Sequence, residues 1–363
     1  MLKKLNLLEE TLRPSLEQAL NLRYDICTCS HCRRAILTHA MAQIGGPAAL
    51  IAPEELEAAV HQLKLSRGAD LNHALFAAIE QVSGKPPHAI KEDFQATFKA
   101  LLEKIRKERN LDLRNYHLAL LRRRLALRIR ANGLRSYAEY IKLLEKDPRE
   151  FDKLFETLCI NVSEFFRDTP VWVTVQYLFE NMLRQRGKDA GKTLRIWSAG
   201  CASGEEAYTI AIVLKEVLGS LRSLHSGLQA QIFATDIDKI CLHSVRKAEY
   251  KPESMKNVNE RLMEKYFLNV AGALRVVEDV RKMVEADYLD LTSDEFLKDI
   301  DVIFCRNVFI YFNRTLQDQL LRHFHASLKP GGYIVLGTAE SLSLDLKRLF
   351  EEIDANARIF RKI

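Results

Sequence analysis

The sequence predicts an α/β protein, with an open, doubly wound sheet in the second half of the chain and α-helical domains before it. From about residue 193, short apolar runs alternate with stretches of helical periodicity, which is typical of successive βαβ units. A glycine turn connects the first apolar run to a helix, as at the ligand-binding edge of such sheets. Before residue 160 the apolar residues recur mainly at helical spacing, which predicts the helical part.

The composition excludes several classes of protein. The chain has 363 residues, too many for one ordinary domain, and its 47% hydrophobic and 28% charged residues are typical of a globular protein. No stretch approaches the roughly 18 apolar residues that span a bilayer, and acids among the first ten residues argue against a secretory signal. Seven unevenly spread cysteines do not resemble a disulfide framework. We therefore expect a cytoplasmic protein.

The first predicted domain covers residues 1–90. Glycine and prolines at 84–88 stop helix formation and mark its end. Apolar periodicity predicts helices at 5–16, 35–44 and 71–82.

A cysteine cluster follows the first of these helices, at Cys27, Cys29 and Cys32 with His31 among them. Thiolates are common zinc ligands, although this spacing is tight for a single ion. The fourth ligand would be His31 or a residue of a second chain, which would make this extension a dimer interface. The alternative is a set of partly buried thiols that bind no metal.

The second predicted domain, residues 91–160, is helical and basic. Between residues 99 and 135, twelve basic residues stand against three acidic ones, a net charge of +9 in a chain of net charge +6. Such a positive field favours binding to an acidic partner, whether a nucleic acid, an anionic membrane or an acidic protein face. The alternative is a helix face that is only solvated and binds no partner. The basic residues are Lys99, Lys104, Arg106, Lys107, Arg109, Arg114, Arg122, Arg123, Arg124, Arg128, Arg130 and Arg135.

The third predicted domain, residues 161–363, carries the sheet. An insertion at about 250–290 interrupts the alternation of strands and helices. The last apolar run is expected to finish the sheet as an edge strand. Strands are predicted at 194–197, 231–234, 301–305, 333–336 and 357–362, and helices at 205–218 and 313–328.

The turn from Gly200 to Gly204 is the strongest chemical signal. Glycines let a ligand approach the backbone closely, and the following helix presents free N–H groups. This helix opens with Glu205 and Glu206, which would repel a phosphate but suit a cationic ligand such as S-adenosylmethionine, with its sulfonium and ammonium groups. The alternative is a plain turn between a strand and a helix.

Two further strands end in polar residues at the same expected edge. Asp236 follows the second strand, where an acid accepts hydrogen bonds from ribose hydroxyls. Asp is also a favoured helix cap, and Asp238 can fill that role instead. The third strand ends in Cys305-Arg306-Asn307, without the Asn/Asp-Pro-Pro-Tyr/Phe motif of base-modifying methyltransferases, which argues against a nucleic-acid substrate despite the basic helices.

Over about residues 92–363, the chain resembles the chemotaxis receptor methyltransferases, the CheR family. The resemblance implies a class I S-adenosylmethionine methyltransferase sheet, similar to a Rossmann fold, with a small β-subdomain within 250–290 and a helical domain at 91–160. Five motifs carry it, in the expected order: Asn161-Val-Ser163-Glu-Phe-Phe-Arg167, Gly200-Cys-Ala-Ser-Gly204-Glu-Glu206, Ala234-Thr-Asp236-Ile-Asp238, Cys305-Arg-Asn307-Val308 with Ile310-Tyr311-Phe312, and Leu328-Lys-Pro-Gly-Gly332.

The resemblance also implies the roles of individual residues. Glu205 or Glu206 would meet the cationic end of the cofactor, and Asp236 would meet its ribose. Arg167 and Tyr311 would lie near the transferred methyl group as the catalytic residues. The remaining cofactor-binding residues would be Asn161, Ser163 and again Arg167 on the linker side, Gly200 in the turn, Asp290 and Asn307 on the adenine side, and Val308.

The implied reaction is an in-line displacement, in which a receptor glutamate carboxylate attacks the methyl carbon of the sulfonium. An ionised carboxylate needs no general base, so catalysis rests on alignment and on removal of water. Arg167 would orient the carboxylate and Tyr311 would contribute a hydroxyl. The structural alternatives are an Arg167 that pairs with Glu164 or Asp168, and a core Tyr311.

The expected partner is a methyl-accepting chemotaxis receptor or a similar acidic helical protein, so the membrane would be reached only through the receptor. The basic helices would steer the enzyme towards it. Two rival functions stay open: a methyltransferase fold that binds the cofactor without turnover, and a nucleic-acid methyltransferase.

Residues 1–90 resemble the late-competence ComFB-like domain. The matching residues lie at Asn6 to Glu10, at Cys27 to Cys32, and at Ala78 to Val82. The resemblance implies a sensory role linked to cyclic dinucleotides. This chain has Ala-Gln-Ile-Gly-Gly-Pro at 42–47, where that family commonly has Asn-x-Leu-Pro-Pro-x-Tyr, which puts an inherited ligand site in doubt.

Overall fold

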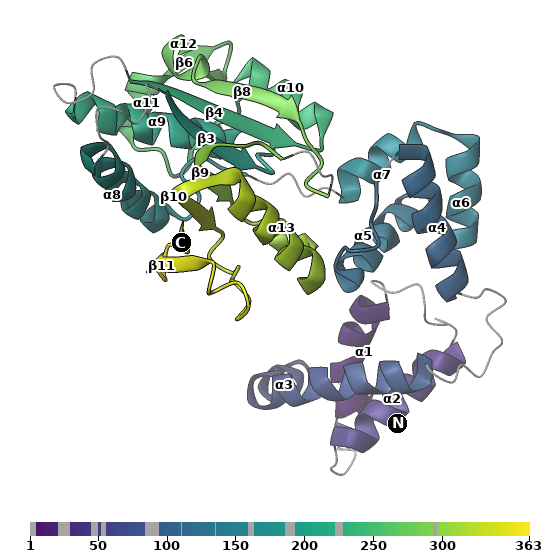
Figure 1. The fold of residues 1–363 in the computed structure, drawn as a ribbon. Helices are drawn as coiled ribbons and strands as arrows, with labels where there is room; N and C mark the ends of the chain where they lie inside the picture. The colour runs from purple at the N-terminus through teal and green to yellow at the C-terminus, as the bar shows by residue number, and fades with distance from the viewer. Residues whose placement is uncertain are drawn as a thin grey trace. The chain divides into compact units, whose positions relative to one another are not determined.

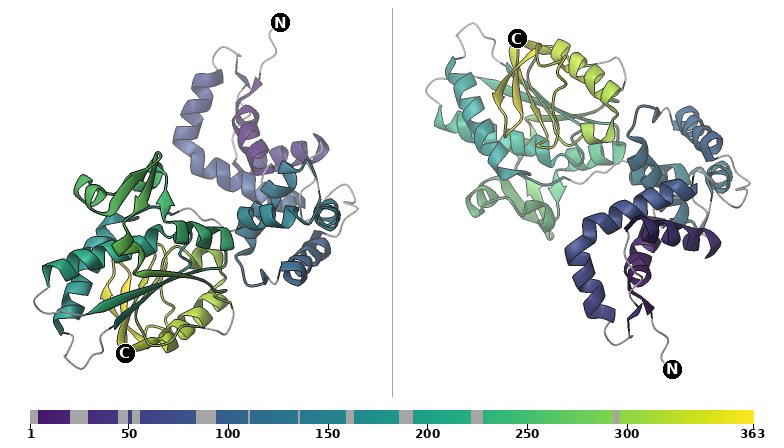
Figure 2. Two further views of the ribbon diagram at one scale, coloured as in Figure 1. Left: turned by 90° about the horizontal axis from the view of Figure 1, so that it is seen from above. Right: turned by 90° about the horizontal axis from the view of Figure 1, so that it is seen from below.

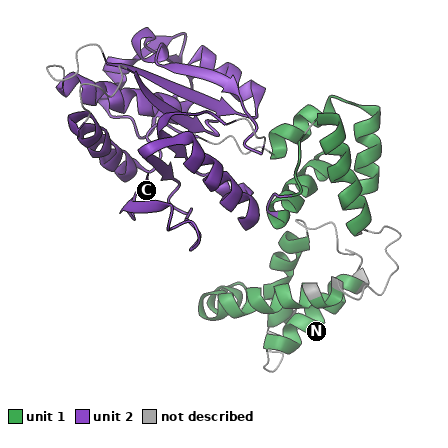
Figure 3. Ribbon diagram, viewed as in Figure 1, with its two compact units in different colours: residues 1–114, 118–158 green, residues 115–117, 159–363 purple. Residues whose placement is uncertain are grey.

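The computed structural model describes residues 5–20, 30–44, 50–51, 56–83, 94–109, 111–134, 136–158, 163–185, 193–221, 228–292 and 296–363. The chain divides into two compact units (Figure 3). The first unit comprises residues 1–114 and 118–158, and the second comprises residues 115–117 and 159–363.

The first helices of unit 1 pack around an apolar core. This core contains Leu12 and Leu16 of α1, Ile36 of α2, and Leu75 and Ile79 of α3, which confirms the helical periodicity of this region. The third helix starts well before the predicted residue 71 and has a kink at Arg67. The elements are β1 (Leu5–Asn6), α1 (Leu7–Leu20), α2 (Ser30–Ile44), β2 (Leu50–Ile51), which pairs with β1, and α3 (Leu56–Ser83).

Four more helices lie in the described part of unit 1: α4 (Phe94–Arg109), α5 (Leu118–Ala131), α6 (Tyr137–Lys146) and α7 (Glu150–Leu158). A buried ion pair holds three of them together. Arg128 of α5 donates to Glu150 of α7 at 2.5 and 2.6 Å, and the Tyr140 hydroxyl of α6 donates to the same carboxylate at 2.9 Å. Removal of one partner from such a cluster would leave an uncompensated buried charge.

Unit 2 contains a seven-stranded sheet in the order β11-β12-β10-β9-β3-β4-β8 (Figure 1). The five strands from β10 to β8 are parallel, and β12 and β11 are added antiparallel. This is the predicted α/β sheet. Its strands are β3 (Thr193–Ala199), β4 (Gln229–Asp236), β8 (Val284–Tyr288), β9 (Ile300–Cys305), β10 (Leu328–Leu336), β11 (Phe350–Asp354) and β12 (Ile359–Lys362).

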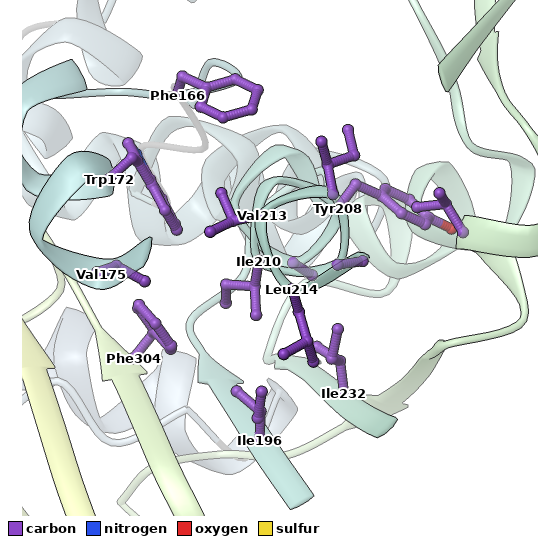
Figure 4. Packing of buried hydrophobic residues seen from close by; sticks show 14 of the residues in the cluster. Phe166, Trp172, Val175, Ile196, Tyr208, Ile210, Val213, Leu214, Ile232 and Phe304 are labelled. Atoms are coloured by element: carbon purple, nitrogen blue, oxygen red, sulfur yellow. The ribbon is translucent and has the colours of Figure 1, made fainter. Parts of the chain in front are cut away.

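Helices cover both faces of this sheet (Figure 2). Alternate residues of a strand point to opposite faces, so Ile196 and Phe304 pack with α8 and α9, whereas Trp197 and Ile303 pack with α13. Figure 4 shows Trp172 and Val175 of α8 against Phe304, with Ile210 and Leu214 of α9 above the neighbouring strands. The helices are α8 (Thr169–Gln185), α9 (Glu205–Ser220), α10 (Lys239–Lys247) and α13 (Arg314–Ser327).

A separate three-stranded antiparallel sheet, in the order β5-β7-β6, lies in the predicted insertion. It accounts for residues 249–276 of the region at about 250–290, whereas β8 belongs to the large sheet. The elements here are β5 (Glu249–Tyr250), η2 (Pro252–Met255), α11 (Glu260–Tyr266), β6 (Phe267–Val270), β7 (Ala273–Val276) and α12 (Glu278–Arg281).

The prediction that residues 357–362 form an edge strand is wrong. β12 lies inside the sheet, between β10 and β11, and β11 is the edge on that side. β11 reads Phe-Glu-Glu-Ile-Asp and buries only its Phe350 well, so it lacks the apolar run by which strands are recognised. Short, charged edge strands of this kind protect a sheet from pairing with other chains.

No helix in the described ranges is long and apolar enough to cross a membrane.

Candidate functional site

The turn after β3 lies at the carboxyl edge of the parallel strands. Gly200 and Gly204 have φ angles of +75° and +95°, which glycine adopts without strain. A Cβ atom on Gly200 would lie 2.6 Å from Val308 Cγ2, so Val308 packs directly over the turn. The N–H groups of Gly200 and Cys201 donate to the main-chain oxygen of Thr235 at 2.8 and 3.0 Å. The turn is thus fixed to the end of β4.

Asp236 at the end of β4 supports the same turn. Its Oδ2 accepts from the Ala202 N–H and its Oδ1 from the Asp238 N–H, both at 2.9 Å. Burial raises the pKa of Asp236, partly opposed by these N–H donors. Two bonds leave a carboxylate with further lone pairs for a ligand. Asp238 caps α10 by accepting from Ile240 N–H at 2.8 Å, which confirms the separate cap expected for it.

Glu205 carries an unsatisfied buried charge. It is the first residue of α9 and only 5% exposed, and its Oε2 atom is buried without a hydrogen-bond partner. Burial raises the pKa of Glu205 to about 7. Buried polar atoms in folded proteins are nearly always paired, so an orphan of this kind indicates a missing ligand. A cationic group would satisfy it.

Glu206 is satisfied by the protein itself. Its Oε1 accepts from the Ser198 hydroxyl at 2.8 Å, and its Oε2 lies 3.5 Å from Nη1 of Arg306. Burial raises the pKa of Glu206, and the nearby Arg306 guanidinium opposes that effect. Of the two carboxylates between which the sequence does not choose, Glu205 is therefore the one with an acceptor available.

The linker before α8 brings Arg167 to this edge. Phe166 and Asp168, its two neighbours, have left-handed φ angles of 53° and 57°. The Arg167 main-chain oxygen accepts from Trp172 Nε1 at 2.9 Å and from Arg306 Nη2 at 3.2 Å.

The acids considered as structural partners of Arg167 have other partners. Glu164 pairs with Lys256 at 2.5 Å, and Asp168 pairs with Arg306 at 2.8 Å. Ser163 is partly buried at the start of the same linker, and Asn161 lies outside the described residues.

The loop after β9 carries Asn307, Val308 and Tyr311. Asn307 has a φ of 60°, and the 3-10 turn η3 (Phe309–Tyr311) follows it. Tyr311 is partly buried, and its main-chain oxygen accepts from His117 N–H at 2.8 Å. The loop therefore lies against residues 115–117, which belong to the same unit.

The structure adds Glu340, which the sequence reasoning missed. This carboxylate is 4% exposed and accepts from the N–H groups of Gly337 at 2.7 Å, Asn307 at 3.1 Å and Phe309 at 2.7 Å. Burial raises the pKa of Glu340, and these donors oppose the effect. An acid shortly after a strand, the signal that singles out Asp236, is present here as well, after β10.

Asp290 lies beyond β8 at the same edge of the sheet. Its Oδ1 accepts from the N–H and the hydroxyl of Thr292, both at 2.8 Å. The preceding Leu289 N–H donates to the Asp236 main-chain oxygen at 3.2 Å, which places this segment beside the end of β4.

The proposed zinc ligands are only partly covered. Cys27 and Cys29 lie outside the described residues, and Cys32 is buried in α2. Within the described residues, no group of three or more His, Cys, Asp or Glu side chains could hold a metal ion. Zinc is therefore not supported here and stays a prediction.

Comparisons with known proteins match most of the chain. A family model described as "CheR methyltransferase, SAM binding domain" matches residues 161–359, and "CheR methyltransferase, all-alpha domain" matches residues 96–159. "Chemotaxis protein methyltransferase 2" of Pseudomonas aeruginosa is 33% identical over 260 residues, which are 70% of this chain and 88% of that protein. "Chemotaxis protein methyltransferase" of Escherichia coli is 30% identical over 263 residues, 70% of this chain and 87% of that protein.

Proposed function

Because the chain belongs to the CheR methyltransferase family and is an S-adenosylmethionine-dependent methyltransferase, we propose that it esterifies glutamate side chains of a chemotaxis receptor. The observation that carries the site assignment is the buried, unpartnered Oε2 of Glu205 at the carboxyl edge of the sheet. This atom can accept a hydrogen bond from a cationic group, and the cofactor of this family is a cation.

The residues at this edge fit the cofactor. Glu205 would meet its ammonium group, and Asp236 retains lone pairs for ribose hydroxyls. Asn307, Val308 and Asp290 would border the adenine, while Asn161, Ser163, Arg167 and Gly200 would complete the pocket. When bound, the cofactor supplies an electrophilic methyl group on a sulfonium.

The chain's own residues would act by orientation. The acceptor glutamate is ionised at neutral pH and is already a nucleophile, so the protein need not remove a proton. Arg167 would hold that carboxylate and Tyr311 would place a hydroxyl beside it, as the catalytic residues. Alignment of this kind can supply much of a barrier reduction, provided that water is excluded.

The remaining assignments concern partners and organisation. We take the chain as a ComFB-like extension (1–90), a helical domain (91–160) and a methyltransferase domain (161–363). The basic helices would meet acidic receptor helices, and nucleic acid is not expected as substrate. The protein would act in the cytoplasm, with contact to the membrane only through the receptor. A zinc-linked dimer through residues 1–90 would be a further property of the extension.

The test is transfer of radiolabelled methyl from S-adenosylmethionine to cytoplasmic receptor fragments by the full chain. We expect label that mild base releases as methanol, which identifies a carboxyl ester. Arg167→Ala should lower transfer by at least about a hundredfold. Arg361→Ala is the matched control, because Arg361 forms an exposed ion pair with Glu351 on the outer strands of the sheet.

The outcomes separate the rival functions. Tight cofactor binding without transfer to any receptor fragment would favour a binding module. Label that enters DNA or RNA, with affinity that falls steeply with salt, would favour a nucleic-acid methyltransferase. Either result contradicts the proposal.

A further inference from the structure

The guanidinium of Arg306 lies in a buried polar cluster that the proposed reaction does not use directly. Arg306 follows β9, and its side chain is only 1% exposed. Its Nη2 lies 2.8 Å from Asp168 Oδ2 and donates to the Arg167 main-chain oxygen, and its Nη1 lies 3.5 Å from Glu206 Oε2. The guanidinium also lies over the ring of Trp172, 5.4 Å from its centre. One side chain thus connects a strand end, the linker and α9.

The linker that Arg306 contacts carries strain on both sides of Arg167. Left-handed φ angles are unfavourable for non-glycine residues, more so for Phe166 than for Asp168, so they persist where other contacts enforce them. Arg306 and Trp172 supply such contacts, because both donate to the main-chain oxygen between the two strained positions. The main chain that carries the Arg167 side chain is therefore held by two donors, Trp172 and Arg306.

Arg306 also separates the roles of two adjacent carboxylates. It pairs with Glu206 and leaves Glu205 as the one with an unpartnered buried oxygen. A lysine at position 306 would keep one charge, but it has no planar fork and cannot bridge Asp168, Glu206 and a main-chain oxygen together.

We propose that Arg306 is a positioning residue for methyl transfer, which holds the main chain of Arg167 so that the Arg167 guanidinium meets the acceptor carboxylate. This inference rests on the proposed function of the site. Arg306 acts through Arg167 and does not touch the acceptor, because its side chain is buried and both Nη atoms face protein oxygens, which leaves only Nε without a partner. Its loss should therefore reduce turnover far more than cofactor binding.

The test compares Arg306→Lys with Arg361→Lys in the full chain. We expect Arg306→Lys to lower kcat by at least about tenfold, because small displacements of a reacting group cost that much, while the Kd for S-adenosylmethionine changes by less than about threefold. Asp168→Asn removes the negative charge that pairs with Arg306, and it should also lower kcat. Melting temperatures verify that each variant is folded.

The effect must also depend on Arg167. If Arg306 works through Arg167, Arg306→Lys adds little to the loss of kcat already caused by Arg167→Ala. Unchanged kcat in both folded variants, or a full additional loss on top of Arg167→Ala, would overturn the inference.

A readout without substrate distinguishes failure of this inference from failure of the proposed function. The indole N–H of Trp172 shares the Arg167 oxygen with Arg306, and the chain has only two tryptophans to resolve by NMR. Arg306→Lys should make hydrogen exchange of this indole at least about tenfold faster, whereas Arg361→Lys should not. If the wild-type protein transfers no methyl, the proposed function fails, and an unchanged exchange rate would then overturn the role of Arg306 as well.

Discussion

Glu205 shows how one buried atom links the sequence to chemistry. Two adjacent glutamates open α9, and burial alone does not decide between them, because Glu205 is buried and the Glu206 side chain is only 12% exposed. Hydrogen bonding distinguishes them: Ser198 and Arg306 reach Glu206. The charge on Glu205 is thus left for a ligand, and its binding should depend on pH.

We predict that cofactor affinity rises with pH up to about 7. The pKa of Glu205 is raised to about 7 by burial, and a cation binds only the ionised form, so protonation below pH 7 weakens binding. Between pH 5.5 and 7.5 the Kd measured by calorimetry should fall by roughly 20-fold. Glu205→Gln should bind weakly and abolish this pH dependence, and a wild-type Kd that does not change with pH would refute the assignment.

The same group should affect stability with the opposite sign. The unfolded carboxyl has a pKa near 4.5, so the folded protein without cofactor binds more protons between about pH 4.5 and 7. Stability therefore falls as pH rises through that window. Bound cofactor should remove the loss, which thermal melting with and without S-adenosylmethionine would detect.

Gly200 is the second single residue on which the binding site depends, because it sets the conformation of the turn after β3. We predict that Gly200→Ala lowers the free energy of unfolding by about 1–3 kcal/mol, because the positive φ disfavours alanine and the new methyl meets Val308. Cofactor affinity should fall with it, since Val308 must move. Gly219→Ala is the control: its Cβ would meet nothing within 4 Å, so urea unfolding should show no loss of stability.

At the scale of elements, the site depends on loops that follow parallel strands. The loop after β9 has an irregular backbone, and two of its N–H groups, those of Asn307 and Phe309, donate to Glu340, which lies beyond β10. Asn307, Val308 and Tyr311 are therefore oriented by a residue more than 25 positions away in the sequence.

We predict that Glu340→Gln disorders this loop. An amide supplies only one acceptor oxygen, so at least one of the three buried N–H groups loses its partner, which costs about 1–3 kcal/mol. The Kd for the cofactor should rise by about tenfold by calorimetry. Glu352→Gln, on the exposed edge strand β11, should leave the free energy of unfolding and the cofactor Kd unchanged. An unaltered cofactor Kd in Glu340→Gln would show that the loop holds without the carboxylate.

At the scale of the whole molecule, several charges of the basic segment at residues 99–135 are compensated by acidic side chains. Acidic residues of later helices form ion pairs with this segment. The pairs are Glu145 with Lys104, Glu150 with Arg128, and Asp152 with Arg109. Such compensation cannot be read from a window of sequence. Lys99 and Arg123 remain exposed, and they are the side chains on which receptor steering would depend.

We predict that Lys99→Glu with Arg123→Glu raises the KM for receptor fragments by about tenfold at low salt, because association is steered by charge. The difference from wild type should shrink as salt is added. The Kd for S-adenosylmethionine should not change. Lys347→Glu with Arg348→Glu, an exposed change of equal charge in the other unit, is the control. An equal rise of KM in the control would show a general charge effect.

Much of the fold could be predicted from the sequence because it depends on local patterns. Apolar periodicity identified helices in both units, among them α9 and α13 but not α8 or α10, and apolar runs identified β3, β4, β9 and β10. Parallel strands share a carboxyl edge, so Gly200, Asp236 and Asn307 could be expected to meet there. The outer strands β8 and β11 were not identified, because a strand paired on one side needs few buried residues.

The sequence by itself determined the α/β class, the glycine turn and the residues at one edge of the sheet. Only the tertiary structure decided that Glu206 pairs with Arg306, that Glu205 keeps an unpartnered oxygen, and that Glu340 holds the Asn307 loop. The physical reason is that periodicity arises between neighbours along the chain. Burial and charge pairing arise between residues that only the folded chain brings together.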